Sequence, residues 1–403
     1  MQQMDITIVG GGLAGMVAAI ALARGSRSVV LVAPPAARAD RRTTALMDQS
    51  IRFLERLAVW DRIAPSTAPL ATMQIIDGTS RLLRAPTVAF RAPEIGLEAF
   101  GYNMPNKALL AALAAAISAE GNITVIDATA TAIDIRPDSV VVTLDNGQTV
   151  QSSFVVGADG RSSMVREAAG ISVKTWAYPQ SAMVLNFSHS LPHRNISTEF
   201  HTESGPFTQV PLPGDRSSLV WVQAPEDAAA NAAKSPPELS LLVESRMQSL
   251  LGKVTVEDGV QVWPLSGMTA ARFGKGRAAL IGEAAHVFPP IGAQGLNLSL
   301  RDIMALADIL GEQPQQPISA SAGDRFDRKR RTDILSRTAS VDLLNRSLLS
   351  DFLPVQMLRA AGLHVLASLP PLRDIVMREG IEPGRGVSFL PAFLRKKLRR
   401  QAS

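Results

Sequence analysis

A glycine-rich turn near the start of the chain limits the fold more than any other feature. Asp5 to Val9 is predicted to form a short buried strand, and the turn Gly10-Gly11-Gly12-Leu13-Ala14-Gly15 follows it directly. An alanine-rich helix to Arg24 and a second apolar strand, Ser28 to Ala33, come next. In this context the G-x-G-x-x-G spacing is typical of a dinucleotide-binding fold. Gly10 would make the tight turn, Gly12 would admit a pyrophosphate, and Gly15 would let helix pack on strand.

One part of that pattern is absent. A dinucleotide-binding fold usually has an acidic residue at the end of its second strand, where the carboxylate bonds the adenosine ribose. Here the position is Ala33, and Pro34 and Pro35 follow it. We therefore expect the ribose to be held by other groups or to be held less well.

A second ligand-type loop lies far along the chain, from Gly282 to Asn297. It follows an apolar run, Ala278 to Ile281, and leads into a helix whose apolar stripe runs from Leu296 to Leu310. Gly295 leaves the backbone bare near the start of that helix. Free N–H groups and the helix dipole at such an end favour a negatively charged ligand. The loop therefore predicts a binding site rather than a simple connection.

A third motif follows a predicted hairpin formed by Val140 to Leu144 and Thr149 to Val156. The second strand of this hairpin runs into Gly157-Ala158-Asp159-Gly160. A carboxylate between small residues at a strand end suits a ligand's hydroxyl groups. An ordinary Asp-Gly turn would account for these residues equally well.

The remaining segments predict an α/β protein: a Rossmann-like domain with an inserted mixed β-sheet domain and a helical C-terminal region. Strands are expected at 182–187, 196–201, 207–212 and 218–222, a loop at 224–237, and a helix carrying Leu239 to Leu250. We assign 1–75, 100–175 and 265–320 to the nucleotide-type domain, 76–99 and 176–264 to the inserted domain, and 321–403 to the C-terminal region.

Composition excludes several classes of function. The chain has no cysteine, so disulfides, cysteine-bound metals and thiol catalysis are excluded, and a cytoplasmic setting is expected. The five histidines show no metal spacing. The formal net charge of +5 equals the charge of the last basic cluster, Arg395, Lys396, Lys397, Arg399 and Arg400. We therefore expect no nucleic-acid-binding face, and the tail is either a solvated run or attracted to an anionic membrane surface.

Taken in order, the three motifs resemble those of the single-component, FAD-dependent aromatic hydroxylases, and most closely the branch that hydroxylates ubiquinone precursors. The resemblance covers about residues 4 to 380. Further matching segments are Arg42 to Leu46, Leu57 to Trp60, Phe154 to Ser163, Tyr178 to Gln180, Gly205-Pro206, Ser218 to Trp221, Gly292 to Asn297 and Arg301-Asp302.

The resemblance implies a set of FAD-binding residues. Gly10, Gly12 and Gly15, with Leu13 and Ala14 between them, would hold the FAD pyrophosphate, and Arg42 and Lys107 would assist at the phosphates. Asp159 belongs to a motif associated with FAD and nicotinamide use. Gly282 and Glu283 would lie at the ribityl chain. Pro290, Gly292, Gln294, Gly295, Leu296 and Asn297 would line the flavin, with the last three presenting N–H groups to its pyrimidine edge. Pro290 and Tyr178 would line the substrate pocket, although loop rigidity and core packing explain them equally well.

The implied activity is hydroxylation of an electron-rich phenol ring with O2 and NAD(P)H, the nicotinamide docking transiently because no second glycine motif exists. The family favours Asp where this chain has Glu283, so with Ala33 we expect weaker FAD binding than is usual.

The resemblance leaves three functions open. The leading one is hydroxylation of a polyprenylated phenol in ubiquinone biosynthesis, by an enzyme that contacts the inner face of a membrane peripherally and works beside other quinone-pathway proteins. The others are hydroxylation of a small soluble aromatic compound, and a non-catalytic, flavin-poor accessory protein that binds a lipid precursor.

Overall fold

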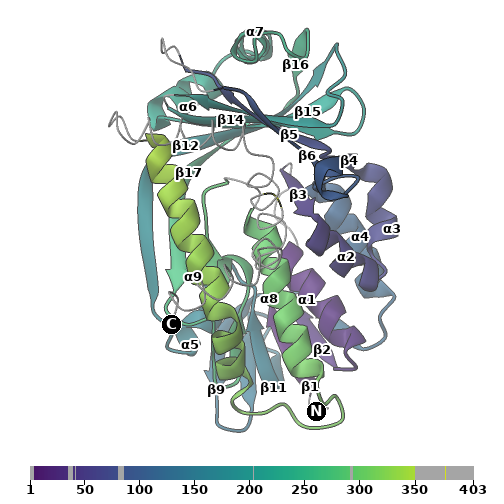
Figure 1. Ribbon diagram of the computed structural model, residues 1–403. Coiled ribbons are helices and arrows are strands. Elements are labelled where there is room, and N and C mark those ends of the chain that lie inside the picture. Colours follow the sequence, from purple (N-terminus) through teal and green to yellow (C-terminus); the bar gives the residue numbers. More distant parts are fainter. Residues whose placement is uncertain are drawn as a thin grey trace, which may run out of the picture.

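Two large β-sheets lie one above the other in the computed structural model, with helices between and around them (Figure 1). The structure describes residues 4–34, 40, 42–79, 86–202, 204–290, 294–349 and 377. Gly292 and the basic cluster at residues 395–400 lie outside these ranges, as do most of the apolar segments predicted after residue 349. Within the described residues no helix is both long enough and apolar enough to cross a membrane.

The first sheet is the nucleotide-type sheet that the opening motif predicts. Its central strands β1 (Met4–Val9), β2 (Val29–Val32), β8 (Ile123–Ile126), β11 (Thr149–Gly157) and β19 (Ala278–Leu280) run parallel in the order β19-β11-β1-β2-β8. Antiparallel strands β9 (Ala130–Ile135), β10 (Val140–Leu144) and β18 (Gly274–Lys275) extend it. Strands β2 and β19 consist only of apolar residues, all of them buried, as is typical of a parallel sheet covered on both faces.

Helix α1 (Leu13–Arg24) is the centre of the helical layer on this sheet. It contacts α4 (Asn106–Ser118) and α8 (Gln294–Gly311), and α8 contacts α9 (Ala322–Leu349). Eight of the twelve residues of α1 are buried, from Gly15 and Val17 to Ala23, because alanines let the neighbouring helices approach closely. The short helix α5 (Met164–Ala168) follows β11.

The second sheet joins two separate segments of the chain. Its strands, in order across the sheet, are β20 (His286–Val287), β17 (Gln261–Ala270), β12 (Val173–His189), β15 (Arg216–Gln223), β14 (Gly205–Leu212), β13 (Ile196–Thr202), β5 (Thr72–Asp77) and β6 (Val88–Arg91), with β16 (Val254–Val256) beside β12. Helices α6 (Pro225–Ala232) and α7 (Pro236–Arg246) contact this sheet and its edge, and α7 lies on the side away from the first sheet (Figure 1).

A small third sheet connects the two large ones. It contains β3 (Thr43–Met47), β7 (Gly101–Pro105) and β4 (Ala68–Pro69). Around it lie α2 (Asp48–Arg56), α3 (Trp60–Ile63) and the 3-10 turns η1 (Ala64–Ser66) and η2 (Ala92–Ile95). A third 3-10 turn, η3 (Gly282–Ala284), contacts β20 and α8.

The predicted α/β class and the inserted sheet are confirmed, whereas the loop predicted at 224–237 is wrong because it contains α6. Pro225 occupies the first turn of α6, and Glu226 and Asp227 favour the positive end of the helix dipole there. The domain boundaries stay a prediction.

Candidate functional site

The glycine turn has the geometry that a bound phosphate group requires. Gly10 has φ +115°, and a Cβ there would lie 2.3 Å from the carbonyl oxygen of Ala158. A Cβ on Gly15 would lie 1.9 Å from the oxygen of Gly10, so both positions exclude any larger residue. Gly12, in contrast, has open space around it and caps α1 without a side-chain hydrogen bond. The N-terminus of α1, with Leu13 and Ala14, is therefore open to an anion.

The Asp159 loop lies directly beside this turn, since β1 and β11 are parallel neighbours and Ala158 N–H donates to the Val9 carbonyl at 2.8 Å. Asp159 Oδ2 accepts a hydrogen bond from Val165 N–H at 3.2 Å. Its other oxygen, Oδ1, is buried and has no hydrogen-bond partner. Buried acceptors without partners are rare in folded proteins, and one beside a glycine turn fits a ligand hydroxyl.

The loop at Gly282 and Glu283 completes the group. Gly282 has φ +60°, and a Cβ there would lie 3.3 Å from the Cβ of Ala14, so this loop packs against the start of α1. Glu283 is exposed, and its Oε2 accepts a hydrogen bond from Arg161 Nε at 2.9 Å. Arg161 Nη1 also donates to Ser266 Oγ on β17 at 3.0 Å. Arg161 thus bridges the Asp159 loop, the Glu283 loop and the second sheet.

A buried arginine on α5, Arg166, also holds these two loops together. Arg166 Nη1 donates to the Ala284 carbonyl at 3.0 Å, and Nη2 donates to the Arg161 carbonyl at 2.7 Å. The planar guanidinium spans both acceptors at once, which a lysine could not do. Nothing in the sequence singles out Arg166, because its partners are main-chain carbonyls of distant residues.

The start of α8 lies next to the small third sheet. A Cβ on Gly295 would meet nothing within 4 Å, and α8 begins at the preceding residue, Gln294. The buried side chain of Asn297 accepts hydrogen bonds from Met47 N–H at 2.9 Å and Ser50 Oγ at 2.7 Å. It also donates to the Ala45 carbonyl at 2.8 Å. The Asn297 side chain therefore anchors α8 to β3 and α2, which leaves a ligand role to the backbone of Gly295, Leu296 and Asn297.

Arg42 is held by an acid two residues before it. Arg42 Nε and Nη2 donate to the two oxygens of Asp40, both at 2.9 Å, and Asn106 Nδ2 donates to Asp40 at 2.8 Å. Burial alone would raise the pKa of Asp40, but the hydrogen bonds from Arg42 and Asn106 outweigh it and hold the pKa below its ordinary value. The hydrogen bond that Arg42 donates to Asp40 raises the pKa of Arg42. Lys107 is exposed at the start of α4.

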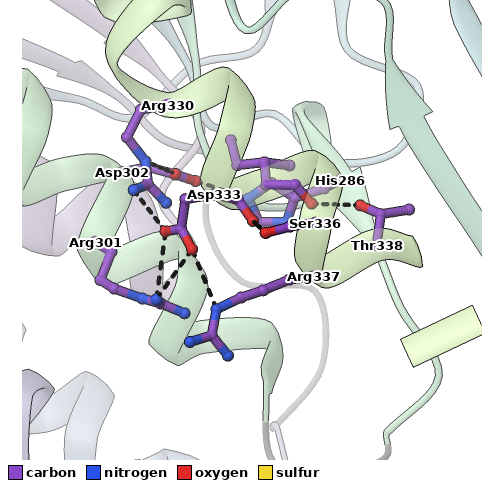
Figure 2. A network of polar contacts seen from close by, with 9 residues as sticks. His286, Arg301, Asp302, Arg330, Asp333, Ser336, Arg337 and Thr338 are labelled. Atoms are coloured by element: carbon purple, nitrogen blue, oxygen red, sulfur yellow. Dashed lines mark hydrogen bonds and ion pairs between the residues drawn. The ribbon is translucent and has the colours of Figure 1, made fainter. Parts of the chain in front are cut away.

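A buried charge network, which the sequence reasoning missed, supports the loop after Glu283 (Figure 2). His286 Nε2 lies 2.7 Å from Asp302 Oδ2, and both side chains are almost fully buried. Asp302 Oδ1 accepts from Arg330 Nε at 2.7 Å, and Arg330 Nη1 lies 2.7 Å from Asp333 Oδ2. The network links β20 to α8 and α9. It therefore holds in place the end of β20, from which the chain continues into Phe288, Pro289 and Pro290.

Two more arginines complete the network around Asp333. Arg301 Nη1 lies 3.3 Å from Asp333 Oδ2, and Arg337 Nε lies 3.2 Å from Oδ1 (Figure 2). Burial, and secondly Arg337, lower the pKa of Arg301 to about 10. The sequence indicates Arg301-Asp302 only as a matching segment, and apart from His286 its partners in this network lie about thirty residues away on α9.

The predicted pocket residues Pro290 and Tyr178 occupy different surroundings. Pro290 is exposed, whereas Pro289 before it is buried. Tyr178 is buried, and its hydroxyl oxygen accepts from Trp176 Nε1 at 2.6 Å and lies 2.7 Å from Asp342 Oδ1. Tyr178 therefore ties β12 to α9, and its pocket role stays a prediction.

The structure brings the three predicted loops together at the carboxyl ends of β1, β11 and β19. The open helix end at Gly12 and the unpaired oxygen of Asp159 fit a dinucleotide such as FAD. Among the described residues, no group of three or more His, Asp or Glu side chains is arranged to hold a metal ion.

Comparison with known proteins agrees with this geometry. Residues 3–334 match the family model described as FAD binding domain. The chain is 33% identical to the ubiquinone hydroxylase UbiL of Rhodospirillum rubrum, over 96% of this chain and 93% of the relative. It is 29% identical to the 3-demethoxyubiquinol 3-hydroxylase of Escherichia coli, over 90% of this chain and 94% of that one. Its fold matches the crystal structure of the p-nitrophenol 4-monooxygenase PnpA of Pseudomonas putida with a TM-score of 0.78, at 18% identity, over 96% of this chain and 100% of that one.

Proposed function

Because the chain belongs to the FAD-binding family and is an FAD-dependent monooxygenase, we propose that it hydroxylates the ring of a polyprenylated phenol in ubiquinone biosynthesis. The observation that carries the proposal is the meeting of the Gly12, Asp159 and Glu283 loops beside a second sheet that can hold a substrate. The relatives named for ubiquinone hydroxylation extend over nearly the whole chain, so they support the pathway as well as the cofactor.

The residues of this chain divide the work of holding FAD. The open helix end at Gly12 would bind the pyrophosphate, with Gly10 and Gly15 keeping the turn close to β11. The unpaired Oδ1 of Asp159 would accept a hydroxyl hydrogen from the cofactor. Glu283 would reach the ribityl chain only by sharing its carboxylate with Arg161.

Other residues would act nearer the flavin ring of the cofactor. Backbone N–H groups at Gly295, Leu296 and Asn297 would stabilise negative charge on the flavin, because they lie at the N-terminus of α8. Arg42 and Lys107 would screen the phosphates. Bound FAD would supply the redox chemistry, in which NAD(P)H is oxidised and one oxygen atom of O2 enters the phenol ring while the other leaves as water.

The protein's part in the chemistry is to position the ring and exclude water. Pro289 and Pro290, held in place through the buried His286–Asp302 pair, would form a rigid wall beside the flavin. A dry, shaped site prevents side reactions such as hydrolysis of reactive intermediates. No acid–base triad is needed, since the cofactor supplies the reactivity.

A membrane-associated substrate fits a protein that contacts the bilayer from its inner face. We include in the proposal a cytoplasmic location with peripheral membrane contact, assisted by the basic cluster at 395–400, and association with other quinone-pathway proteins. The long prenyl chain of such a substrate partitions into the bilayer.

Two measurements test the proposal. Purified protein should be yellow, with the absorption bands of bound flavin, whereas a colourless protein that cannot be loaded with FAD would favour the accessory role that Ala33 and Glu283 suggest. A deletion strain should accumulate a quinone precursor that lacks one ring hydroxyl. Normal quinone levels in that strain would exclude the pathway.

A further inference from the structure

Trp263 is a large aromatic residue that the fold leaves in contact with solvent. It lies on β17, which pairs with β12 on one side along the stretch 261–264 but with β20 on the other side only near its C-terminal end. Trp263 is 49% exposed, whereas Trp60 and Trp221 are 9% and 2% exposed. Core packing therefore accounts for the buried tryptophans but not for Trp263, whose indole has surface available to a ligand.

Two arginines lie along the same stretch of β17. The guanidinium carbon of Arg42 is 6.0 Å from the ring centre of Trp263. Ser266, which follows Trp263 on β17, accepts a hydrogen bond through Oγ from Arg161 Nη1 at 3.0 Å. The side chains of Arg42 and Arg161 are 50% and 52% exposed, respectively. An exposed aromatic ring thus has an exposed guanidinium group on each of two sides.

Both arginines keep hydrogen-bond donors that their acidic partners do not use. Arg42 bonds Asp40 through Nε and Nη2, and Arg161 uses Nε for Glu283 and Nη1 for Ser266. Arg42 Nη1 and Arg161 Nη2 have no acceptor among the residues that the structure describes. A guanidinium group is planar and always charged, and its free N–H groups match the oxygens of a phosphate.

The Trp263 cluster, meaning Trp263, Arg42 and Arg161, lies beside the predicted FAD site, because Arg161 belongs to the Asp159 loop and contacts Glu283. A nicotinamide dinucleotide must reach the flavin, and the chain has no second G-x-G-x-x-G motif to hold it. Such a cosubstrate has a flat adenine ring and a negatively charged pyrophosphate. Aromatic side chains stack on bases and arginines bind phosphates, so the cluster offers one partner for each group.

We propose that the ADP half of NAD(P)H binds at this cluster, with its adenine stacked on Trp263 and its pyrophosphate bonded by Arg161. Arg42, predicted to hold the FAD phosphates, adds positive charge at the boundary between the two ligands. The inference concerns the cosubstrate, so it goes beyond the proposed function and does not depend on which phenol is hydroxylated.

The test titrates FAD-loaded protein with ADP-ribose, which contains the ADP half of NAD(P)H without nicotinamide. Loading with FAD is essential, since FAD also contains an ADP half and must already occupy its own site. Trp263→Leu should raise the Kd for ADP-ribose about tenfold in titration calorimetry, because stacking on the adenine is lost. Trp263→Phe keeps an aromatic ring and should raise the Kd much less.

The visible absorption of bound flavin is followed in the same titrations. We expect wild-type protein and both Trp263 variants to retain FAD throughout. An unchanged Kd for ADP-ribose in Trp263→Leu would overturn the inference. So would loss of FAD from folded Trp263→Leu, or release of FAD by ADP-ribose, because either result would place the indole or the probe in the FAD site.

A second substitution tests the phosphate contact. Arg161→Gln should weaken ADP-ribose about tenfold but leave the Kd for adenosine, which lacks phosphates, unchanged. Arg136→Gln is the matched control, since Arg136 is 53% exposed and forms a comparable ion pair with Asp134 at 2.7 Å. It should change neither Kd. Equal weakening of adenosine and ADP-ribose by Arg161→Gln would contradict the role of Arg161 at the pyrophosphate.

Discussion

Ala33 and Glu283 are two residues near the predicted cofactor site at which the family resemblance leads us to expect an acidic residue and an aspartate, respectively. Ala33 follows β2 directly and its side chain is partly exposed, so a longer side chain can extend from it. Glu283 keeps a carboxylate, but that carboxylate is shared with Arg161. Both features predict that FAD is held by fewer hydrogen bonds than the fold usually provides.

Restoring the missing acid should strengthen FAD binding. We expect Ala33→Glu to lower the Kd for FAD by about tenfold, since a hydrogen bond to a charged group contributes roughly 1.5–3 kcal/mol. Titration of flavin-free protein measures it, and Ala33→Gln, which has the same shape without the charge, should give a smaller gain. If wild-type protein keeps stoichiometric FAD through prolonged dialysis, the weak-binding premise is wrong.

Asp333 makes stability depend on pH in the acid range. Burial opposes ionisation of this carboxyl, but Arg301 and Arg330 outweigh it and hold its pKa below the ordinary value of 3.8. A carboxyl with a lowered folded-state pKa stabilises the protein above its unfolded pKa, and this contribution is lost as the pH falls through the folded value. The relevant window therefore lies below about pH 4.

Asp333→Asn tests this dependence. At pH 7 the variant should be less stable than wild type by roughly 1–3 kcal/mol, because three arginines lose their shared acceptor charge. Urea unfolding at a series of pH values should show the difference shrinking below pH 4, as wild-type Asp333 takes up a proton. A difference that stays constant down to pH 3 would show that Asp333 acts through packing alone.

At the level of elements, α5 acts as the support of two ligand loops. Its Arg166 reaches the Arg161 carbonyl in the loop before α5 and the Ala284 carbonyl in η3. The contact joins residues more than a hundred positions apart, so it fixes the spacing of the two loops together with the Arg161–Glu283 ion pair.

Arg166→Lys should loosen that support without removing the charge. A lysine cannot bond both carbonyls in the same geometry, so one buried acceptor loses its partner at a cost of roughly 1–3 kcal/mol. We expect a lower midpoint of urea unfolding together with weaker FAD binding. Lys275→Arg, at a position that bonds only the Ala169 carbonyl, serves as a control. If the variant is destabilised but binds FAD as tightly as wild type does, α5 does not support the cofactor site.

The elements that the sequence predicts well are those with strong local signals. The G-x-G-x-x-G turn, the hairpin before Asp159 and the apolar stripe of α8 all follow from periodicity and glycine placement. Helix α6 was missed because Pro225 and Asn231 are typical of loops, and this signal was weighted above the high helix propensity of the alanines between them. The His286–Asp302–Arg330 network was missed for a different reason: its members meet only through tertiary packing of β20, α8 and α9.

At the scale of the whole molecule, the predicted cofactor site lies where loops associated with the three sheets meet. The turn and the Asp159 loop come from the first sheet, Glu283 lies beside the second through Arg161 and Ser266, and Asn297 ties α8 to the third. Local sequence patterns can predict each of these loops separately. That Arg161 takes the carboxylate of Glu283 could not be predicted, because it depends on the pairing of β11 with β19, two strands that lie more than a hundred residues apart in the sequence.

Attraction of the whole molecule to an anionic membrane surface is expected to depend on its basic tail. The basic cluster at 395–400 carries five positive charges and accounts for the entire formal net charge. Each basic residue near an anionic surface contributes about 1 kcal/mol of attraction, so deletion of residues 383–403 should abolish most sedimentation with phosphatidylserine vesicles. Replacing the five basic residues by glutamine should have the same effect, and added salt should weaken wild-type binding because the attraction is screened. If truncated protein sediments as wild type does, the described residues or the apolar segments after 349 must provide the membrane contact, and the basic cluster is only a solvated tail.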